Sequence, residues 1–175
     1  AAETQAIVDA MAAGREQSCH IPLRHKNGML FPVLTHVCKG VWNGKPALFG
    51  VTQDITLLQF SEEKFSQAFE NNALMMAIVD TATQAHIDSN EVFCRTLGYQ
   101  KAEVIGKTPY ELSLFDSEAD MRFAARVLGE HQALNNVETV IRARGGERLS
   151  VLLHISHVHI GMLSCAIVSM LDITE

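Results

Sequence analysis

The strongest constraint on the fold is an internal repeat that aligns without a gap. A shift of 118 residues, which carries Arg24 onto Arg142, also carries the tripeptide Asp-Ile-Thr at 54–56 onto the same tripeptide at 172–174. Further identical pairs lie between these anchors: Gly28 with Gly146, Val33 with Val151, Leu34 with Leu152 and His36 with His154. Two copies are too few for a solenoid. The repeat therefore indicates two related domains in tandem.

Each copy of the repeat has the pattern of an antiparallel three-stranded meander. In the first copy the turn is His-Lys-Asn-Gly at 25–28, where Asn and Gly tolerate a positive φ. A second strand is predicted over 30–39 and a third over 47–54. The second copy repeats this order, with a turn at 144–147 and strands over 148–159 and 165–172.

The residues before the second copy add a front half to it. Their patterns predict an amphipathic helix over 61–71, strands over 74–80 and 85–88, a short helix capped by Ser89 or Asn90 and ended by Gly98, and a long helix over 118–131. This order predicts an α+β domain, in which a five-stranded antiparallel sheet carries helices on one face.

The first copy lacks such a front half. Residues 1–56 are therefore predicted to form a partial, three-stranded domain, 57–72 a connecting helix and 73–175 a complete domain. A three-stranded sheet with one uncovered apolar face is not expected to fold well alone. A neighbouring part of the chain or a second chain is expected to cover it.

Composition and charge limit the classes of partner that the chain is expected to bind. The 175 residues carry a formal net charge of -6, which lacks the positive field that phosphate binding requires, so no nucleic-acid partner is expected. No apolar run approaches the roughly 18 residues of a membrane span, so no membrane segment is expected within the chain. The four cysteines include no Cys-x-x-Cys pair. This usage is typical of a reduced, cytoplasmic protein.

Two motifs in the front half resemble a known family. Residues 90–99 read Asn-Glu-Val-Phe-Cys-Arg-Thr-Leu-Gly-Tyr, and Glu-Val-Ile-Gly-Lys follows at 103–107. They resemble the PAS domain pattern, in which an Asn opens a helix that ends in Leu-Gly-Tyr and a Glu-x-Ile-Gly-Lys segment follows. The Gly turn and terminal Asp-Ile-Thr of each copy resemble the C-terminal half of that family, the PAC motif. The resemblance covers 61–175 in full and 1–56 as a C-terminal half.

The resemblance implies a sensory or signal-relay module rather than an enzyme. Such a module binds a small molecule between sheet and helices, or another copy of itself, and passes the change to an output domain. Here the output domain would lie beyond Glu175, as a histidine kinase or as a diguanylate cyclase or phosphodiesterase. The chain itself has no nucleophile-elbow, P-loop or His-Glu-x-x-His motif. No catalytic residue is therefore predicted.

The resemblance also implies a ligand pocket. The residues expected to line it are Phe93, Leu97, Ile105, Leu112, Phe123, Val127, Ile155 and Ile167. The alternative is that these apolar residues only fill the core. In that case the module would be a structural dimerisation relay without a ligand.

Haem and flavin are the cofactors that the resemblance raises. Haem sensors of the family use a histidine on the long helix, where His131 lies, although a histidine in a last turn also suits the helix dipole. Flavin photosensors carry Asn-Cys-Arg-Phe after the Gly-Lys turn, but 106–112 contain no cysteine. That disfavours a photoadduct and leaves non-covalent flavin open. His154, His157 and His159 lack an obvious third ligand, so no metal site is predicted.

The repeated Asp-Ile-Thr is interpreted as a signal junction. Asp54 or Thr56 can accept hydrogen bonds from free backbone amides of the next segment and so set the angle between the sheet and the outgoing helix. Asp172 and Thr174 would do the same at the second exit. The resemblance implies that such a helix lies along a dimer axis, so a homodimer is expected. The alternative is a generic strand end with a turn-forming Asp.

Overall fold

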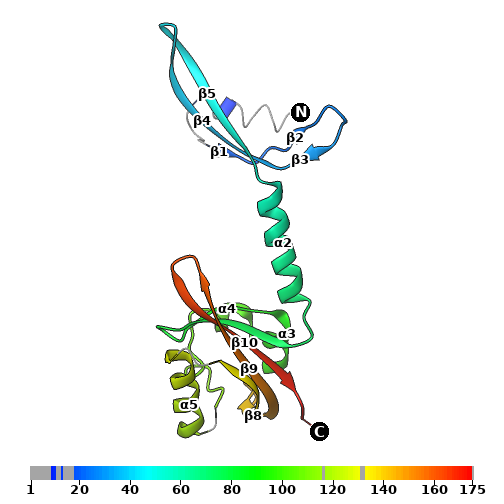
Figure 1. Ribbon diagram of the computed structural model, residues 1–175, viewed down its shortest axis with the longest axis vertical. Coiled ribbons are helices and arrows are strands. Elements are labelled where there is room, and N and C mark those ends of the chain that lie inside the picture. Colours follow the sequence, from blue (N-terminus) through cyan, green and yellow to red (C-terminus); the bar gives the residue numbers. More distant parts are fainter. Residues whose placement is uncertain (1–8, 11–12, 14–17, 116, 131–132, 175) are drawn as a thin grey trace. The chain divides into compact units, whose positions relative to one another are not determined.

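The computed structural model describes residues 9, 10, 13, 18–115, 117–130 and 133–174. The chain forms two compact units, Ala1–Phe65 and Ser66–Glu175, and the elements of each unit are labelled in Figure 1. Among the described residues, no helix combines the length and the apolar character that crossing a membrane demands.

The first unit is built from strands. They are β1 (Ser18–Cys19), β2 (Leu23–Arg24), β3 (Leu30–Phe31), β4 (Val33–Trp42) and β5 (Lys45–Asp54). β1, β4 and β5 form a three-stranded sheet in that order, and β2 pairs with β3. Pro32 separates β3 from β4, because proline has no N–H to donate to a ladder. The strand predicted over 30–39 is therefore two strands, and the second continues to Trp42.

Helix α2 (Thr56–Glu70) follows β5 directly. It begins at Thr56, whereas the helical pattern predicted a start at 61. The earlier start has a local cause, because the Asp54 carboxylate accepts a hydrogen bond of 2.9 Å from the Thr56 backbone N–H. A helix can thus begin immediately after the strand, with its first free amide satisfied.

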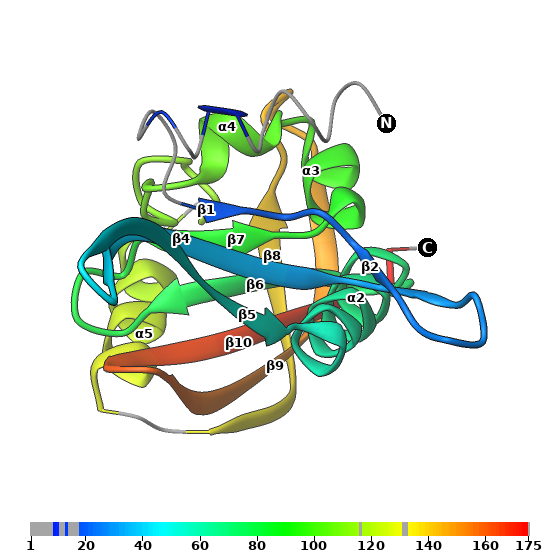
Figure 2. The ribbon, with the colours of Figure 1, turned by 90° about the horizontal axis from the view of Figure 1, so that it is seen from above.

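The second unit joins a five-stranded sheet to three further helices. Its elements are β6 (Met75–Asp80), β7 (His86–Ser89), α3 (Glu91–Leu97), α4 (Lys101–Val104), α5 (Glu118–Gly129), β8 (Leu134–Arg142), β9 (Arg148–Ile160) and β10 (Leu163–Asp172). The strand order is β7-β6-β10-β9-β8, with every neighbouring pair antiparallel. β7, β6 and β10 can be followed side by side in Figure 2. The α+β prediction with a five-stranded antiparallel sheet is confirmed.

Local signals in the sequence position the helices of this unit. The Asn90 side chain accepts a hydrogen bond of 2.9 Å from the Phe93 N–H and so caps the start of α3. Gly98 ends α3 with a φ of 76°, in the left-handed region where glycine carries no steric penalty. Ser117 caps α5 by accepting from the Asp120 N–H at 3.0 Å. Near Pro109 the chain forms a run of turns.

The two faces of the five-stranded sheet bury different partners. Alternate side chains of β6, β9 and β10 meet the helices on one face and form the main core. Its members include Met75, Ala77, Val79, Phe93, Leu97, Val104, Val127, Val151, Leu153, Ile155 and Ala166. On the other face Phe69 from the last turn of α2 forms a smaller cluster with Ile78 and Cys165. Helices α3 to α5 therefore share one face, and the end of α2 packs on the other.

The sequence repeat is reproduced by backbone hydrogen bonds. β4 pairs with β5 in the register that β9 keeps with β10, so that Val33 faces Asp54 and Val151 faces Asp172. The two Gly turns have the same conformation, with a φ of 89° at both Gly28 and Gly146. The Asp-Ile-Thr bonds also correspond: the N–H of Ile55 donates to Pro32 O at 3.1 Å, and that of Ile173 to Ser150 O at 2.9 Å.

Candidate functional site

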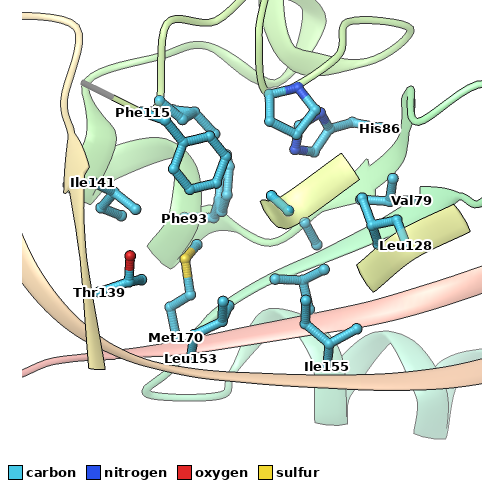
Figure 3. Close-up of a pocket in the computed structure, with 15 residues that line it drawn as sticks. Val79, His86, Phe93, Phe115, Leu128, Thr139, Ile141, Leu153, Ile155 and Met170 are labelled. Carbon is cyan, nitrogen blue, oxygen red and sulfur yellow. The ribbon is translucent and has the colours of Figure 1, made fainter. Parts of the chain in front are cut away.

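The second unit contains an apolar cavity of about 50 Å³ between the sheet and the helices. The cavity and its walls are drawn in Figure 3. Phe93 of α3, Leu128 of α5 and Phe115 from the segment before α5 close it on the helical side. The sheet side consists of alternate residues of β6, β8, β9 and β10, namely Ala77, Val79, Thr139, Ile141, Leu153, Ile155, Val168 and Met170.

Of the described residues in the cavity wall, His86 on β7 is the one with an ionisable side chain. It is only 3% exposed. Its Nδ1 lies 2.6 Å from the carbonyl oxygen of Lys107, which already accepts the His86 backbone N–H at 2.9 Å. A carbonyl oxygen can only accept, so Nδ1 carries the proton. Burial lowers the pKa of His86, and the bond to Lys107 opposes this more weakly. The imidazole is therefore held neutral, in one tautomer.

The neutral tautomer leaves Nε2 of His86 as a hydrogen-bond acceptor. The hydrogen bonds formed by the described residues engage this ring through Nδ1. One nitrogen of the ring points toward the centre of the cavity in Figure 3. The Phe93 ring lies against the imidazole, with a centroid separation of 5.6 Å. Thr139 is the only other described wall residue with a side-chain nitrogen or oxygen, and it lies across the cavity from His86 (Figure 3).

Asn90 connects the cavity wall to the last turn of α2. Its side chain is fully buried, at 0% exposure. Its Oδ1 accepts from the N–H of Met76 at 3.0 Å and from that of Phe93 at 2.9 Å. Its Nδ2 donates to the carbonyl oxygens of Phe69 at 3.0 Å and Leu74 at 2.9 Å. All four hydrogen-bonding positions of the amide are used, which leaves one orientation of the side chain.

A second contact holds the same end of α2. The Glu70 carboxylate accepts from the Glu91 N–H at 2.9 Å and pairs with Lys101 at 3.0 Å. Lys101 also pairs with Asp88 at 2.7 Å. These ion pairs are half-exposed, so each is expected to contribute less than about 1 kcal/mol. The buried amide of Asn90, rather than the ion pairs, is expected to dominate the attachment of α2.

Each Asp-Ile-Thr forms the same small hydrogen-bonded turn. Asp54 accepts from the Thr56 N–H at 2.9 Å and from its hydroxyl at 2.6 Å, and Asp172 accepts from the Thr174 N–H at 2.9 Å. The threonine side chain is the main cause of the lowered pKa of both carboxyls, and the threonine N–H adds to it. This geometry agrees with an Asp that accepts from the segment that follows. The role of the four residues as a signal junction stays a prediction.

Two of the eight residues expected in the pocket line the cavity. They are Phe93 and Ile155. Leu97, Leu112 and Val127 are buried in the surrounding core but do not border the cavity. Their burial agrees with the alternative in which these residues fill the core.

The remaining three expected residues lie elsewhere. Ile105 and Phe123 are 39% and 38% exposed and do not border the cavity. Ile167 points to the opposite face of the sheet, because it alternates along β10 with Ala166 and Val168, and Val168 does border the cavity. In place of Ile167, its neighbour Val168 lines the cavity. Binding of a ligand by any of these residues stays a prediction.

Sequence reasoning missed the polar part of the site. His86 and Thr139 were not among the expected pocket residues, and neither were Leu153 and Met170. Strict alternation from Ile155 and Val168 would have found the last two. No local signal distinguishes His86, because its position in the wall depends on β7 folding back beside β6.

The residues present do not fit haem or flavin. An engineered cavity of about 150 Å³ holds a benzene molecule, and the cavity here, at about 50 Å³, is smaller than that. Cys94 is buried in α3, where its sulfur lies 3.3 Å from the Ser89 hydroxyl, and it does not border the cavity. His131, the expected haem ligand, lies outside the described residues. Within the described part of the chain, no three His, Cys, Asp or Glu side chains are grouped to hold a metal ion.

Comparisons with known proteins agree with this architecture. A family model described as a PAS domain matches residues 73–175. No curated protein matches the chain. The crystal structure of the PAS domain of an HTR-like protein from Haloarcula marismortui is similar, with a TM-score of 0.57 and 22% identity, over 67% of this chain and 95% of that chain.

Two further solved structures share the fold. The Rhodobacter sphaeroides LOV protein has a TM-score of 0.54 and 21% identity, over 67% of this chain and 70% of that chain. A PAS domain from a two-component sensor histidine kinase has a TM-score of 0.54 and 9% identity, over 66% of this chain and 98% of that chain. At these identities the likeness concerns the fold alone.

Proposed function

The chain belongs to the PAS domain family, and we propose that it is a sensory and signal-relay module in which the cavity of the second unit is coupled to α2 through Asn90. The observation that carries the proposal is the pair of bonds made by one buried amide. Asn90 binds the backbone of Phe93, whose ring forms the cavity wall, and the carbonyl of Phe69 in the last turn of α2. A ligand that displaces Phe93 would therefore act on the attachment of α2.

The coupling follows from the stiffness of the parts between the two sites. Phe93 is 1% exposed and lies in a close-packed core, so it cannot move without moving the start of α3. The start of α3 is capped by Asn90, and the same side chain holds β6 through Leu74 and Met76. A two-state element biased by both sites is the physical requirement for such coupling. We propose that the last turn of α2, docked or frayed, is that element.

The test of this proposal combines one cavity variant with one Asn90 variant. Ala124→Met adds volume at a residue that borders the cavity, and Ala125→Met places the same side chain on α5 outside the cavity. Filling the cavity is expected to raise amide hydrogen exchange at 67–71 by about threefold, a coupling energy in the usual range for residues in contact. Ala125→Met is the matched control and should leave these amides unchanged.

Asn90→Asp is the second variant, and combining it with Ala124→Met gives a double-mutant cycle. Aspartate has the shape of asparagine and keeps the two accepted bonds, but it cannot donate to Phe69 and Leu74. Loss of these donors should cost about 2 kcal/mol and raise exchange at 67–71 by at least tenfold. Ala124→Met should then have no further effect at these amides. An undiminished effect of Ala124→Met in the Asn90→Asp background would refute coupling through Asn90.

The first unit and the output complete the proposal. The same hydrogen-bond pattern occurs within each unit. This supports residues 1–56 as the C-terminal half of a second PAS domain, with 57–72 as connecting helix and 73–175 as the complete domain. We propose that the signal passes beyond Glu175 to a histidine kinase or a cyclic-dinucleotide enzyme, from Asp172 and Thr174 as the exit. The four cysteines are all free thiols, which supports a cytoplasmic location.

A ligand-free dimerisation relay is the second candidate function. The observation that favours it is a row of exposed apolar side chains on α2, namely Leu57, Leu58, Phe60 and Phe65. Leu58 and Phe65 lie seven residues apart, the spacing of a coiled-coil seam, which supports a homodimer through this helix. The double variant Leu58→Glu with Phe65→Glu should then give a monomer by light scattering. A parent chain that is already monomeric would exclude this relay.

A further inference from the structure

The cavity has one polar side chain whose hydrogen-bonding role is settled by the fold. Nδ1 of His86 is committed as a donor to Lys107 O at 2.6 Å. The imidazole is 3% exposed and packs against Phe93, so the charged form is disfavoured. Nε2 therefore offers one lone pair and no proton, and the ring bond that the described residues form uses Nδ1 instead. A ligand that donates to this nitrogen gains a hydrogen bond, whereas a donor that met only the apolar wall would be buried without a partner.

The remaining wall determines what else the ligand can be. Of the fifteen described residues that border the cavity, thirteen have no side-chain nitrogen or oxygen. A second polar group on the ligand would therefore be buried without a partner unless it reached Thr139. Among the described residues that border the cavity none has a cationic or anionic side chain, which disfavours charged ligands. The wall thus selects an apolar body with a single polar atom.

The size of the cavity limits the body. A volume of about 50 Å³ exceeds the space of one water molecule. It is well below the roughly 150 Å³ of an engineered cavity that holds benzene. A molecule of about three heavy atoms therefore fits without repacking of the core. A bound water would satisfy Nε2, but it needs two to four polar partners, and the wall near His86 supplies one.

We infer that the cavity takes a compact, largely apolar molecule with one hydrogen-bond donor, of the class of short-chain alcohols, which donates to Nε2 of His86. This inference rests on the proposed sensory function, because it names the ligand class of the same cavity. The hydroxyl hydrogen would bind Nε2, and the alkyl part would lie among Val79, Phe93 and Leu128. With so few atoms, the dissociation constant would be on the order of 1 mM or weaker.

The test uses two probes of identical composition. Ethanol has a hydroxyl donor, and dimethyl ether, its isomer, can only accept. Both are titrated into the whole chain labelled with ¹⁵N, and binding is followed from the amide shifts of Phe93 and Leu128 and from the ring nitrogens of His86. Ethanol should bind roughly three- to tenfold more tightly than dimethyl ether, the range expected for one net hydrogen bond. It should also move the Nε2 resonance toward the value of a hydrogen-bonded nitrogen and leave Nδ1 in place.

Two matched variants locate the donor site. His86→Phe keeps a planar ring but removes the acceptor, and it should abolish the preference for ethanol. Thr139→Val removes the hydroxyl of the other polar wall residue at nearly constant volume and should keep the preference. The Nε2 shift of the parent chain tests the same bond without any substitution, so the result holds even where His86→Phe folds poorly.

The outcomes separate this inference from the proposed function. Equal affinity for the two probes, or a preference that survives His86→Phe, would show that the cavity selects by shape alone and would overturn the inference. Absence of any shift with ethanol at molar concentration would overturn it as well. The coupling of the cavity to α2 is measured independently by Ala124→Met and hydrogen exchange at 67–71, which needs no ligand. The experiments can therefore refute the ligand class without refuting the coupling of the cavity to α2, and they can refute the coupling without refuting the ligand class.

Discussion

In the first unit β4 and β5 pair residue for residue as β9 and β10 do in the second, yet aligned side chains are exposed to very different extents. Leu48 is 49% exposed, whereas Ala166, the residue aligned with it by the repeat, is 0% exposed. The second unit covers this face with α3 to α5, elements that the described part of the first unit lacks. Strand pairing is therefore decided within the repeat, and burial is decided by the front half.

The difference in burial has a functional consequence. The cavity, His86 and Asn90 all belong to the front half of the second unit or face it. The first unit keeps the Gly turn, the hairpin and the Asp-Ile-Thr that leads into α2. The two copies thus share the local structure that joins a sheet to the next element, and they differ in the front half that encloses the cavity.

The largest expected loss of stability comes from truncating a buried leucine in the second unit, and an exposed leucine of the first unit serves as the comparison. Leu97→Ala removes a side chain that is 0% exposed and should destabilise the second unit by about 3 kcal/mol. Leu48→Ala, at the exposed face of the first unit, should cost less than about 1 kcal/mol. Urea unfolding of the whole chain, followed by NMR signals assigned to each unit, measures both. A similar cost at the two positions would mean that the face of the first unit is buried in solution.

A smaller loss of stability is expected from substituting the glycine of each Gly turn. Gly28→Ala and Gly146→Ala each place a side chain at a φ of 89° with no atom within 4 Å of the new Cβ, so strain is the only expected cost. Each substitution should destabilise its own unit by about 1 kcal/mol. The same unfolding measurement gives the two values. Values that differ by more than about 0.5 kcal/mol would show that the turns depend on their surroundings.

The smallest expected effect concerns acid stability at Asp54 and Asp172. Both carboxyls have a pKa below the ordinary value of 3.8. A lowered folded-state pKa adds stability above the unfolded pKa, and this contribution is lost as the pH falls through the folded pKa. Each unit should therefore lose a little stability below about pH 4. Asp54→Asn should flatten this dependence in the first unit and Asp172→Asn in the second, measured by urea unfolding at pH 3 and pH 7.

The sequence-based predictions were more accurate for features that depend on neighbouring residues than for features that depend on residues far apart in the chain. The cap at Asn90, the stop at Gly98 and the Gly turns depend on neighbours a few residues away, and the structure confirms all of them. The start of α2 was placed too late, because the helical pattern of 61–71 is stronger than that of 56–60 and the cap from Asp54 was read as a junction only. In the pocket, Phe93 and Ile155 were found by family resemblance, and Ile167 was placed on the wrong face.

The sequence by itself determined that one meander occurs twice, where its turns lie and how each copy ends, because backbone conformation at Gly28, Gly146 and Asp-Ile-Thr is governed by adjacent residues. Only the tertiary structure decided what the Asn90 amide binds. Its partner Phe69 lies 21 residues away, and their contact exists because α2 docks on the opposite face of the sheet from α3. Free space inside a core is likewise a property of packing among distant side chains, so the cavity and the open nitrogen of His86 emerge only in three dimensions.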